Sequence, residues 1–510
     1  MFAKVFSGGL LGIDGFLVEV EIDLTRSGLP AFSLVGLAEG AVRESKERIF
    51  SALKNNGFKL PPARITINLA PANQRKEGSL FDLPLSIGLL VAAGLLPKSS
   101  FLERTLLAGE LSLNGELRPI AGALPLALLA KNKGLKYVVL PRDNGPEAAV
   151  VKGVEVFALE NLAQVVSLLE GKELTPFQVD VDSLFQEQTS FLEDFSEVKG
   201  QEHVKRAIEI AAAGGHNLLL VGPPGSGKTM LAKRIPTILP PLTFSEALEV
   251  TKIYSVSGQL PPQVSLLTQR PFRAPHHTIS DAGLIGGGHY PRPGEVSLAH
   301  RGVLFLDELP EFKKHVLEVL RQPLEDGEVT IARASMSLRY PASFMLVAAM
   351  NPCPCGYLGD EKHHCSCTPL QIQRYRSRLS GPLLDRIDLQ VEVPAVEYKK
   401  LRQEQSEFSS KKMLKRVLTA REIQQKRYQE ASLPFLTNSE LNGRWLNKFC
   451  PLGEREHAFL EQAVKNLGLS ARAFTRILRL GRTIADLEGK ENLDVPILAE
   501  AISYRFLDRT

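Results

Sequence analysis

The sequence predicts a multidomain α/β protein that ends in a helical region. Strand-like runs such as FLVEVEIDL and ARITINLA alternate with helix-like runs over residues 1–170. An apolar run then precedes a glycine-rich loop at 218–229, and a charged helical composition begins near residue 399. With 510 residues, the chain is long enough for two or three domains, each with its own core.

These changes in pattern predict four segments. We expect an α/β domain over 1–172, a linker over 173–195, an α/β core over 196–395 and a helical region over 396–510. The linker is expected because TPFQVDVDSLFQEQTSFLEDF is acidic and polar without a clear period. The core contains two inserts, one at about 270–295 and one at 353–367.

Composition is typical of a water-soluble globular protein, with 44% hydrophobic and 23% charged residues. The net charge of +4 is mild, so a polyanionic partner has to be argued from local patches. The longest apolar run, 85–96, is too short to span a bilayer, and the N-terminus lacks the apolar stretch of a signal peptide. Four of the five cysteines lie in one cluster, which fits a metal site in a reducing cytoplasm better than a disulfide scaffold. We expect a cytoplasmic protein that does not enter a membrane.

A phosphate-binding loop is predicted within NLLLVGPPGSGKTML, where an apolar strand precedes the loop and a helix follows it. Glycines let backbone N–H groups surround phosphates without Cβ clashes. Lys228 is expected to reach the β- and γ-phosphates, and Thr229 to bind Mg²⁺. The residues expected around ATP are Gly222, Pro223, Pro224, Gly225, Ser226, Gly227, Lys228 and Thr229.

Two further apolar strands end in polar residues. GVLFLDE ends in Asp307, expected to hold Mg²⁺ with Thr229, and in Glu308, expected to polarise the attacking water. FMLVAAMN ends in Asn351, expected to sense the γ-phosphate or to orient that water. Together with Lys228, these residues predict an ATPase.

Several arginines are candidates for completing the site. Arg386, at a helix end before a strand, could enter a neighbouring subunit's nucleotide site, or could pair with Asp385 or Asp388. An arginine acting in trans requires an oligomer. In the helical region three arginines share one helix face, either solvated or with one member at the nucleotide: Arg472, Arg476 and Arg479.

Basic inserts indicate a nucleic-acid partner. RPFRAPHHTISDAGLIGGGHYPRPGEV is glycine-rich and basic, and either faces a central pore or forms an ordinary surface loop; its adjacent His276 and His277 are expected to be turn residues. The segment EVTIARASMSLRYP is predicted to form a hairpin, and residues 399–430 are predicted to form basic helix. The candidate DNA contacts are Arg270, Arg273, Arg292, Arg333 and Arg339.

The segment CPCGYLGDEKHHCSC predicts a structural metal site. Its thiols form two C-x-C pairs, and four thiolates suit tetrahedral Zn²⁺. His363 or His364 could replace one thiol, and reduced thiols or disulfides are the alternatives to a metal. We expect zinc at a knuckle that stiffens a protrusion able to touch DNA. The expected ligands are Cys353, Cys355, Cys365 and Cys367.

The strings FRAPHHTISDAGLIGGG, LAHRGVLFLDELPEF and SARAFTRILRLGRTIADL resemble the ComM/YifB family of magnesium-chelatase-like AAA+ ATPases. The resemblance covers essentially the whole chain. It implies that 222–229 is Walker A, that Asp307 and Glu308 form Walker B and that Asn351 is sensor 1. It further implies that Arg386 is the arginine finger, with Arg472 as sensor 2 in a magnesium-chelatase C-terminal-like helical lid.

The same resemblance implies a homo-hexameric ring that drives branch migration of DNA on recombination intermediates during natural transformation. Its expected partners are single-stranded and branched DNA, with recombinase-type proteins besides. Two alternatives stay open: a protein remodeller or unfoldase, and a chelatase-type motor subunit. An aromatic-hydrophobic pore loop would favour the remodeller, whereas the glycine-, histidine- and arginine-rich insert favours nucleic acid.

The N-terminal domain resembles the proteolytic domain of Lon, with its ribosomal S5 domain 2-like α/β fold. KEGSLFD places Leu80 at the position of the serine nucleophile, and PIAGAL places Leu124 at that of the lysine. Leucine can act neither as nucleophile nor as base, so we expect a non-proteolytic scaffold. The alternative is a rescue by Ser79 with Lys76.

Overall fold

The chain folds into two compact units, each assembled from two stretches of sequence. Unit 1 comprises Met1–Gln188 and Thr243–Thr268, and unit 2 comprises Thr189–Leu242 and Gln269–Thr510. Residues 399–407 of the expected basic helix, and 188–190 of the expected linker, lie outside the described residues. The computed structural model describes residues 1–26, 29–37, 40–187, 191–288, 290–333, 336–360, 363–395 and 408–509.

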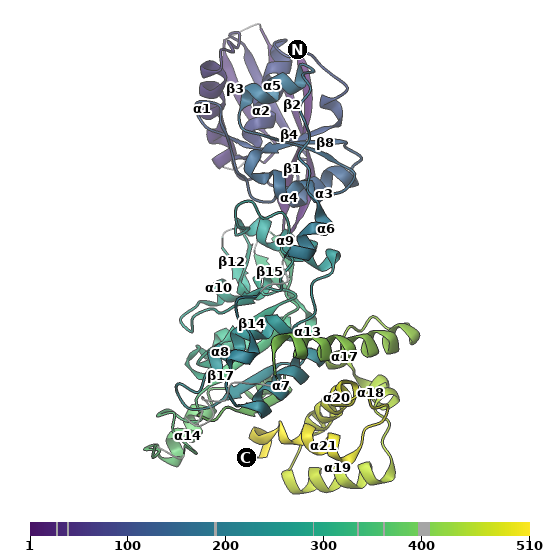
Figure 1. Ribbon diagram of the computed structural model, residues 1–510. Helices are drawn as coiled ribbons and strands as arrows, with labels where there is room; N and C mark the ends of the chain where they lie inside the picture. Colours follow the sequence, from purple (N-terminus) through teal and green to yellow (C-terminus); the bar gives the residue numbers. More distant parts are fainter. Residues whose placement is uncertain are drawn as a thin grey trace. The chain divides into compact units, whose positions relative to one another are not determined.

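Unit 1 is built on a mixed seven-stranded sheet in the order β3-β4-β2-β1-β5-β8-β9 (Figure 1). β1 and β2 form a long antiparallel hairpin that turns at Gly12, whose φ is +65°. β5, β8 and β9 continue the sheet in parallel. The strands are β1 (Phe2–Leu11), β2 (Asp14–Thr25), β3 (Ala31–Val35), β4 (Arg64–Ala70), β5 (Thr105–Leu107), β8 (Tyr137–Pro141) and β9 (Glu155–Leu159), with a small hairpin of β6 (Glu110–Leu111) and β7 (Leu117–Arg118).

Helices cover both faces of this sheet. Val5 of β1 contacts the position of Gly88 in α2, whereas Gly8 of β1 faces Leu126 of α3. Because residues three apart in a strand point to opposite faces, α2 and α3 lie on opposite sides. Every residue of α2 is buried, which accounts for its apolar sequence. The helices are α1 (Gly40–Asn55), α2 (Asp82–Ala93), α3 (Ala123–Asn132), α4 (Gly145–Ala149), α5 (Leu162–Leu169) and α6 (Val181–Glu187).

Helix α9 (Phe244–Ser257) belongs to unit 1, although it follows the phosphate loop in sequence. It packs on α3, and Ser255 Oγ donates a 2.5 Å hydrogen bond to Oε2 of Glu147 in α4. The backbone N–H of Gly122 donates to the carbonyl of Ser255 at 3.1 Å. Lys252 pairs with Asp14 at 2.5 Å. Residues 243–268 therefore pack with unit 1, whereas their place in the sequence put them in the 196–395 core.

Unit 2 contains a five-stranded parallel sheet in the order β11-β14-β17-β10-β18. The strands β10, β14 and β17 are buried along their whole length, so they read as continuous apolar runs. Their carboxyl ends meet at one edge of the sheet. The strands are β10 (Leu218–Val221), β11 (Phe272–Arg273), β14 (Val303–Leu306), β17 (Met345–Met350) and β18 (Leu389–Glu392).

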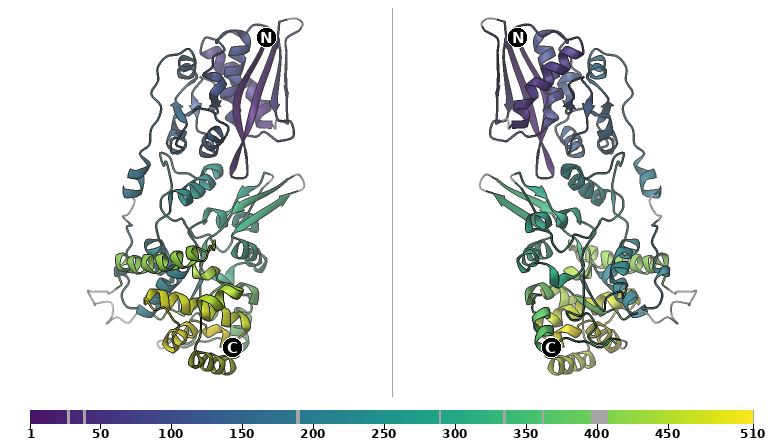
Figure 2. Two further views of the ribbon diagram at one scale, coloured as in Figure 1. Left: turned by 90° about the vertical axis from the view of Figure 1, so that its right-hand side faces the viewer. Right: turned by 90° about the vertical axis from the view of Figure 1, so that its left-hand side faces the viewer.

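Two hairpins extend unit 2 beyond this sheet. β12 (Gly286–Gly287) pairs with β13 (Arg292–Pro293), and β15 (Glu328–Arg333) pairs with β16 (Met336–Pro341). Tyr340 O–H donates to the carbonyl of Pro291 at 2.6 Å, which fixes one hairpin against the other. Figure 2 shows β15 and β16 as a two-stranded arm.

The C-terminal helices share one hydrophobic core with the parallel sheet. α7 lies between them, in contact with α17, α20 and β18. The remaining helices of unit 2 border the sheet and the inserts. The helices are α7 (Glu202–Gly214), α8 (Lys228–Arg234), α10 (Asp281–Ile285), α11 (Glu295–Leu298), α12 (Lys314–Glu318), α13 (Arg321–Asp326), α14 (Pro369–Arg376), α15 (Gly381–Leu384), α17 (Ser410–Glu430), α18 (Gly443–Phe449), α19 (Glu454–Leu467), α20 (Ala471–Leu487) and α21 (Val495–Ser503).

The mixed α/β architecture with parallel strands is confirmed. Most of 410–503 lies in helices as expected, whereas the likeness of unit 1 to the Lon domain stays a prediction. Across the described ranges, no helix is long and apolar enough to cross a membrane. The apolar run 85–96 instead lies largely in the buried helix α2.

The Ser255–Glu147 hydrogen bond predicts a measurable anchoring of α9. Burial raises the pKa of the Glu147 carboxyl, and Ser255 is one of its donors. We expect Ser255→Ala to lower the local free energy of unfolding of α4 and α9 by about 1–3 kcal/mol, because a buried acceptor loses its partner. Hydrogen exchange of peptides from these helices measures this change.

Ser257→Ala is the matched control on the same helix. Its hydroxyl donates only to the carbonyl of Tyr254, at a partly buried position. We expect an effect within about 0.5 kcal/mol. Equal loss of protection in both variants would contradict the assigned role of Ser255.

Candidate nucleotide site and thiol cluster

The loop after β10 requires glycine at several positions. Gly225 and Gly227 have φ of +74° and +87°, a region that favours glycine. A Cβ on Gly222 would lie 2.2 Å from the carbonyl oxygen of Val393, so no larger residue fits there. Gln201 Nε2 donates to the carbonyl of Ser226 at 2.9 Å and to that of Pro394 at the same distance.

Lys228 folds back onto this loop. Its Nζ donates to the carbonyls of Gly222 and Pro223 at 2.7 and 2.9 Å, and lies 3.3 Å from Asn351 Oδ1. Burial lowers the pKa of the Lys228 ammonium, whereas the nearby Asp307 and Glu308 raise it. Lys228, the first residue of α8, and Asn351, which directly follows β17, are therefore brought together.

Carboxylates complete the arrangement beside Lys228. Thr229 Oγ1 donates to Asp307 Oδ2 at 2.6 Å, which places a hydroxyl and a carboxylate together as Mg²⁺ requires. Glu308 has φ of +52°, an uncommon conformation for a residue with a side chain. Its carboxylate is 57% exposed and lies 3.2 Å from Nδ1 of His277.

His277 and Gln201 are site residues that sequence reasoning missed. His277 lies in a turn as expected, and its ring also contacts Glu308 and packs edge-on against Phe312. Gln201 was not singled out, although its amide holds two backbone carbonyls around the phosphate loop. Its position before a helix in VKGQEHVK carried no chemical signal. Both contacts join segments that are distant in sequence.

Three of the four candidate arginines, Arg386, Arg472 and Arg476, pair with residues of their own chain. The guanidinium of Arg386 pairs with Glu325 of α13, rather than with either neighbouring aspartate. Arg472, which is 68% exposed, pairs with Asp385. Arg476 is buried and donates to the carbonyl of Asp385. Each therefore has a partner within its own chain.

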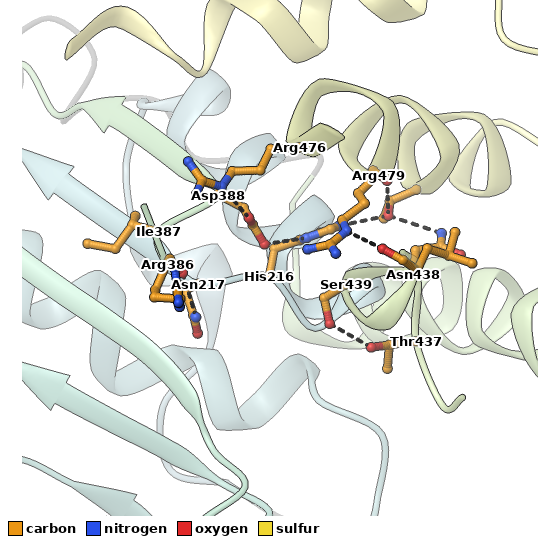
Figure 3. Close-up of polar contacts among 12 residues, drawn as sticks. His216, Asn217, Arg386, Ile387, Asp388, Thr437, Asn438, Ser439, Arg476 and Arg479 are labelled. Atoms are coloured by element: carbon orange, nitrogen blue, oxygen red, sulfur yellow. Dashed lines mark hydrogen bonds and ion pairs between the residues drawn. The ribbon is translucent and has the colours of Figure 1, made fainter. Parts of the chain in front are cut away.

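A buried polar network joins the sheet to the C-terminal helices (Figure 3). His216 is fully buried, with Nδ1 2.9 Å from Asp388 and Nε2 2.8 Å from Thr483 of α20. Asn438 donates to the Thr483 hydroxyl at 3.0 Å and to Asp486 at 2.9 Å. Two residues before Asp388 stands Arg386, whose carbonyl accepts from Asn217.

The candidate DNA contacts fall into two groups. Arg270 donates to the carbonyls of Pro240 and Arg301, and Arg273 forms a bidentate pair with Glu295 at 2.6 and 2.7 Å. These two guanidinium groups are therefore occupied by hydrogen bonds and ion pairs within the chain. The exposed group lies on the two hairpins and consists of Arg292, Arg333 and Arg339, the last 74% exposed and 3.5 Å from Glu328.

The four thiols of 353–367 converge. Cys353 Sγ lies 3.3 Å from Cys355 Sγ and 3.6 Å from Cys365 Sγ, and all four sulfurs lie within 4.8 Å of one another. Tetrahedral Zn²⁺ with bonds of about 2.3 Å places sulfurs about 3.8 Å apart, so the set fits. A hydrogen bond from the Tyr357 backbone lowers the pKa of the Cys355 thiol to about 6, whereas burial and the neighbouring thiols raise the pKa of Cys365 and Cys367.

Neither thiol pair needs a histidine. His363 packs on the ring of Tyr357, and its Nδ1 lies 3.5 Å from Asp360.

In unit 1, the alternative Ser79–Lys76 dyad is not formed. Ser79 donates to Glu110, while the buried Lys76 ammonium donates to the carbonyls of Gly36 and Pro71.

Asp388 predicts a pH dependence of stability. Its burial opposes ionisation, but the hydrogen bond with His216 and the nearby Arg479 and Arg476 outweigh it, so the pKa lies below its ordinary 3.8. A carboxyl with a lowered folded pKa stabilises above its unfolded pKa and loses that contribution as pH falls through the folded value. We expect Asp388→Asn to cost about 1–3 kcal/mol near pH 7. The cost should shrink below pH 3.8.

Urea unfolding of both proteins from neutral to acid pH measures this difference. Asp385→Asn is the control on the same segment, since the Asp385 carboxylate is more exposed than that of Asp388 and pairs with Arg472 and Arg476. A cost of Asp388→Asn that did not vary with pH would contradict the assignment.

Three family models match the chain in succession. Subunit ChlI of Mg-chelatase matches residues 18–144, magnesium chelatase subunit ChlI matches 194–401, and the magnesium chelatase subunit ChlI C-terminal model matches 407–505. Together they cover part of unit 1, the parallel sheet and the C-terminal helices.

Relatives extend this similarity to the full length. Competence protein ComM of Haemophilus influenzae is 45% identical, over 99% of this chain and 98% of its own. Uncharacterized protein YifB of Salmonella typhimurium is 43% identical, over 99% and 97%. The magnesium-chelatase 38 kDa subunit of Rhodobacter capsulatus is 28% identical, over 31% of this chain and 50% of its own. The chain belongs to the ComM/YifB family of magnesium-chelatase-like AAA+ proteins.

Proposed function

We propose that this protein is a Mg²⁺-dependent ATPase that works as a motor. The observation that carries the proposal is the convergence of Lys228, Thr229, Asp307, Glu308 and Asn351 at the ends of three parallel strands. Such an arrangement of a phosphate loop and paired carboxylates suits phosphoryl transfer to water. Membership in a magnesium-chelatase-like AAA+ family supports the same activity.

Each side chain has a role that follows from its place. ATP phosphates would accept the hydrogen bonds that Lys228 Nζ now donates to the backbone carbonyls of its own loop. Thr229 and Asp307 would hold Mg²⁺, which supplies positive charge for the transferred phosphoryl group. Glu308 would orient the attacking water once it leaves His277, and Asn351 would contact the γ-phosphate.

DNA is the proposed track of this motor. The two hairpins present Arg292, Arg333 and Arg339 on one part of unit 2, because Tyr340 joins them through Pro291. Exposed guanidinium groups bind backbone phosphates without sequence preference, as a translocase requires. The relative named competence protein ComM supports a role in natural transformation, where branched recombination intermediates are the substrate we propose.

A homo-hexameric ring is the proposed assembly. Arg386 would leave Glu325 and enter the nucleotide site of the neighbouring subunit, with Arg472 completing the lid of its own site. Recombinase-type proteins are further proposed partners, and the cytoplasm is the proposed location. A chelatase-type motor subunit is the second candidate, favoured by the three family models named for magnesium chelatase.

Zn²⁺ is the proposed resident of the thiol cluster. Four sulfurs within 4.8 Å offer a complete ligand set, so no position is left for water. A closed set of protein ligands is typical of a structural rather than a catalytic zinc.

The proposed motor predicts an ATPase that DNA stimulates. We expect the purified protein to hydrolyse ATP faster with single-stranded and branched DNA, and to displace strands from a four-way junction. Lys228→Ala should abolish both activities, with hydrolysis at least about 100-fold lower, because the transition-state charge loses its lysine. Phosphate release and gel separation of labelled strands measure the two.

Arginine variants separate the track from the ATP site. Arg333→Ala should weaken stimulation by DNA and flatten its salt dependence, without changing hydrolysis in the absence of DNA. Arg273→Ala is the control, since that side chain is paired with Glu295. Hydrolysis that no DNA stimulates would refute the DNA motor and favour a motor that acts on another substrate.

The thiol cluster predicts one zinc ion per chain. We expect mass spectrometry of the purified protein to find about one equivalent of zinc. Cys365→Ser should lose it, because three thiolates bind far more weakly than four. Cys450→Ser and His363→Ala should retain it, since Cys450 lies buried near Leu478 and His363 contacts Asp360. Zinc that persists in Cys365→Ser would refute this ligand set.

A further inference from the structure

The turn that carries the first two thiols lies directly against the phosphate loop. Gly356 is buried, with φ of +87°. A Cβ added to it would lie 2.6 Å from Cδ and 2.8 Å from Cγ of Pro224. Carbon atoms that are not bonded cannot approach so closely, so only a hydrogen fits between this backbone and the proline ring. The ring of Pro224 therefore rests on the thiol-bearing turn.

The same turn begins at the polar residue next to Lys228. Asn351 precedes Cys353 by two residues, and its Oδ1 lies 3.3 Å from Lys228 Nζ. Gly356 closes the turn by donating its N–H to the carbonyl of Cys353 at 3.0 Å. The Cβ position of Gly356 also lies 3.9 Å from Cγ of Asn351. Pro224 is thus in contact with a turn of six residues, 351–356, that begins at Asn351.

What holds this turn in place is the thiol cluster. Cys353 and Cys355 belong to the turn, while Cys365 and Cys367 come from the far end of the insert and lie 3.6 Å or less from one of the first pair. Among the described residues, these two ends are joined without a metal by contacts between the thiols, by a hydrogen bond from the Cys355 N–H to Cys367 Sγ and by the packing of His363 on Tyr357. A metal ion ligated by all four thiols adds coordinate bonds, which fix the backbone of the turn.

We propose that the Zn²⁺ site is a structural part of the nucleotide site: the metal-tied turn braces Pro224 and Asn351, so that loss of the metal weakens nucleotide binding. This inference rests on the proposed ATP binding. The phosphate loop binds through backbone N–H groups, whose directions depend on the support of the loop. In this role the metal supports the phosphate loop, whereas the sequence led us to expect that it stiffens a protrusion able to touch DNA.

Two glycine substitutions test the brace with the metal in place. Gly356 and Gly359 both have positive φ, +87° and +81°, but a Cβ on Gly359 would have nothing within 4 Å. Both variants carry similar backbone strain, and only Gly356→Ala strikes Pro224. We expect Gly356→Ala to weaken binding of a fluorescent ATP analogue roughly tenfold, and Gly359→Ala less than about twofold.

Removal of the opposing ring should relieve the clash. Affinity for the ATP analogue is measured for a double variant, Gly356→Ala together with Pro224→Ala, and for the single variant Pro224→Ala. We expect these two proteins to differ much less than Gly356→Ala differs from the unsubstituted chain. An equal loss in both comparisons would show that Gly356→Ala acts by some other route and would overturn the proposed contact.

Metal removal tests the other half. Zinc is stripped with a chelator, its release is followed with a chromogenic dye, and affinity for the analogue is measured before stripping, after it and after Zn²⁺ is restored. We expect affinity to fall and recover with the metal, and hydrogen exchange in 222–229 to rise without it. Cys365→Ser, whose substitution is remote from Pro224 in sequence, should behave like the stripped protein.

The outcomes are distinguishable. Unchanged affinity in stripped protein overturns the brace and leaves the proposed ATPase intact. A metal-loaded chain that binds no analogue, like Lys228→Ala, overturns the proposed function and the brace with it. If stripping unfolds the chain by circular dichroism, the comparison of metal-loaded Gly356→Ala with Gly359→Ala decides, and equal affinities refute the brace.

Discussion

The parallel register of β10 and β17 is the constraint on which the nucleotide site depends. Val221 lies opposite Met350, and the N–H of Gly222 donates to the carbonyl of Met350 at 3.2 Å. The phosphate loop and Asn351 therefore leave the sheet side by side. On the other edge of β17, Leu306 lies opposite Ala348, which brings Asp307 to Thr229. A slip of one residue would turn every side chain to the opposite face and separate these groups.

How much of this site the sequence revealed depended on whether a feature is local. The phosphate loop, Asp307 and Asn351 could be predicted because each directly follows a short apolar strand. The contact of His277 with Glu308 could not, because it depends on how an insert folds back over a strand end. The convergence of the cysteines could be predicted because they lie within one short segment. The contact of Gly356 with Pro224 joins distant segments, so it appeared only in the structure.

The C-terminal helices illustrate a second reason. Their apolar periodicity predicted packed helices, and α7, α17 and α20 do share a core with the sheet. Periodicity does not reveal the fully buried His216, which takes one partner from β18's preceding segment and one from α20. Buried polar groups of this kind are satisfied only when both segments are in place. Helix packing and the segment that carries Arg386 are thereby connected.

Helix α9 bears on the order in which the chain can fold as it is synthesised. Domains commonly fold in the order in which the ribosome releases them. Unit 1 cannot be completed in that way, because its residues 243–268 emerge after the phosphate loop of unit 2. Until then the part of α3 on which α9 packs has no cover from this helix. The two units are interleaved in sequence, so a gene divided at any single codon would leave at least one of them incomplete.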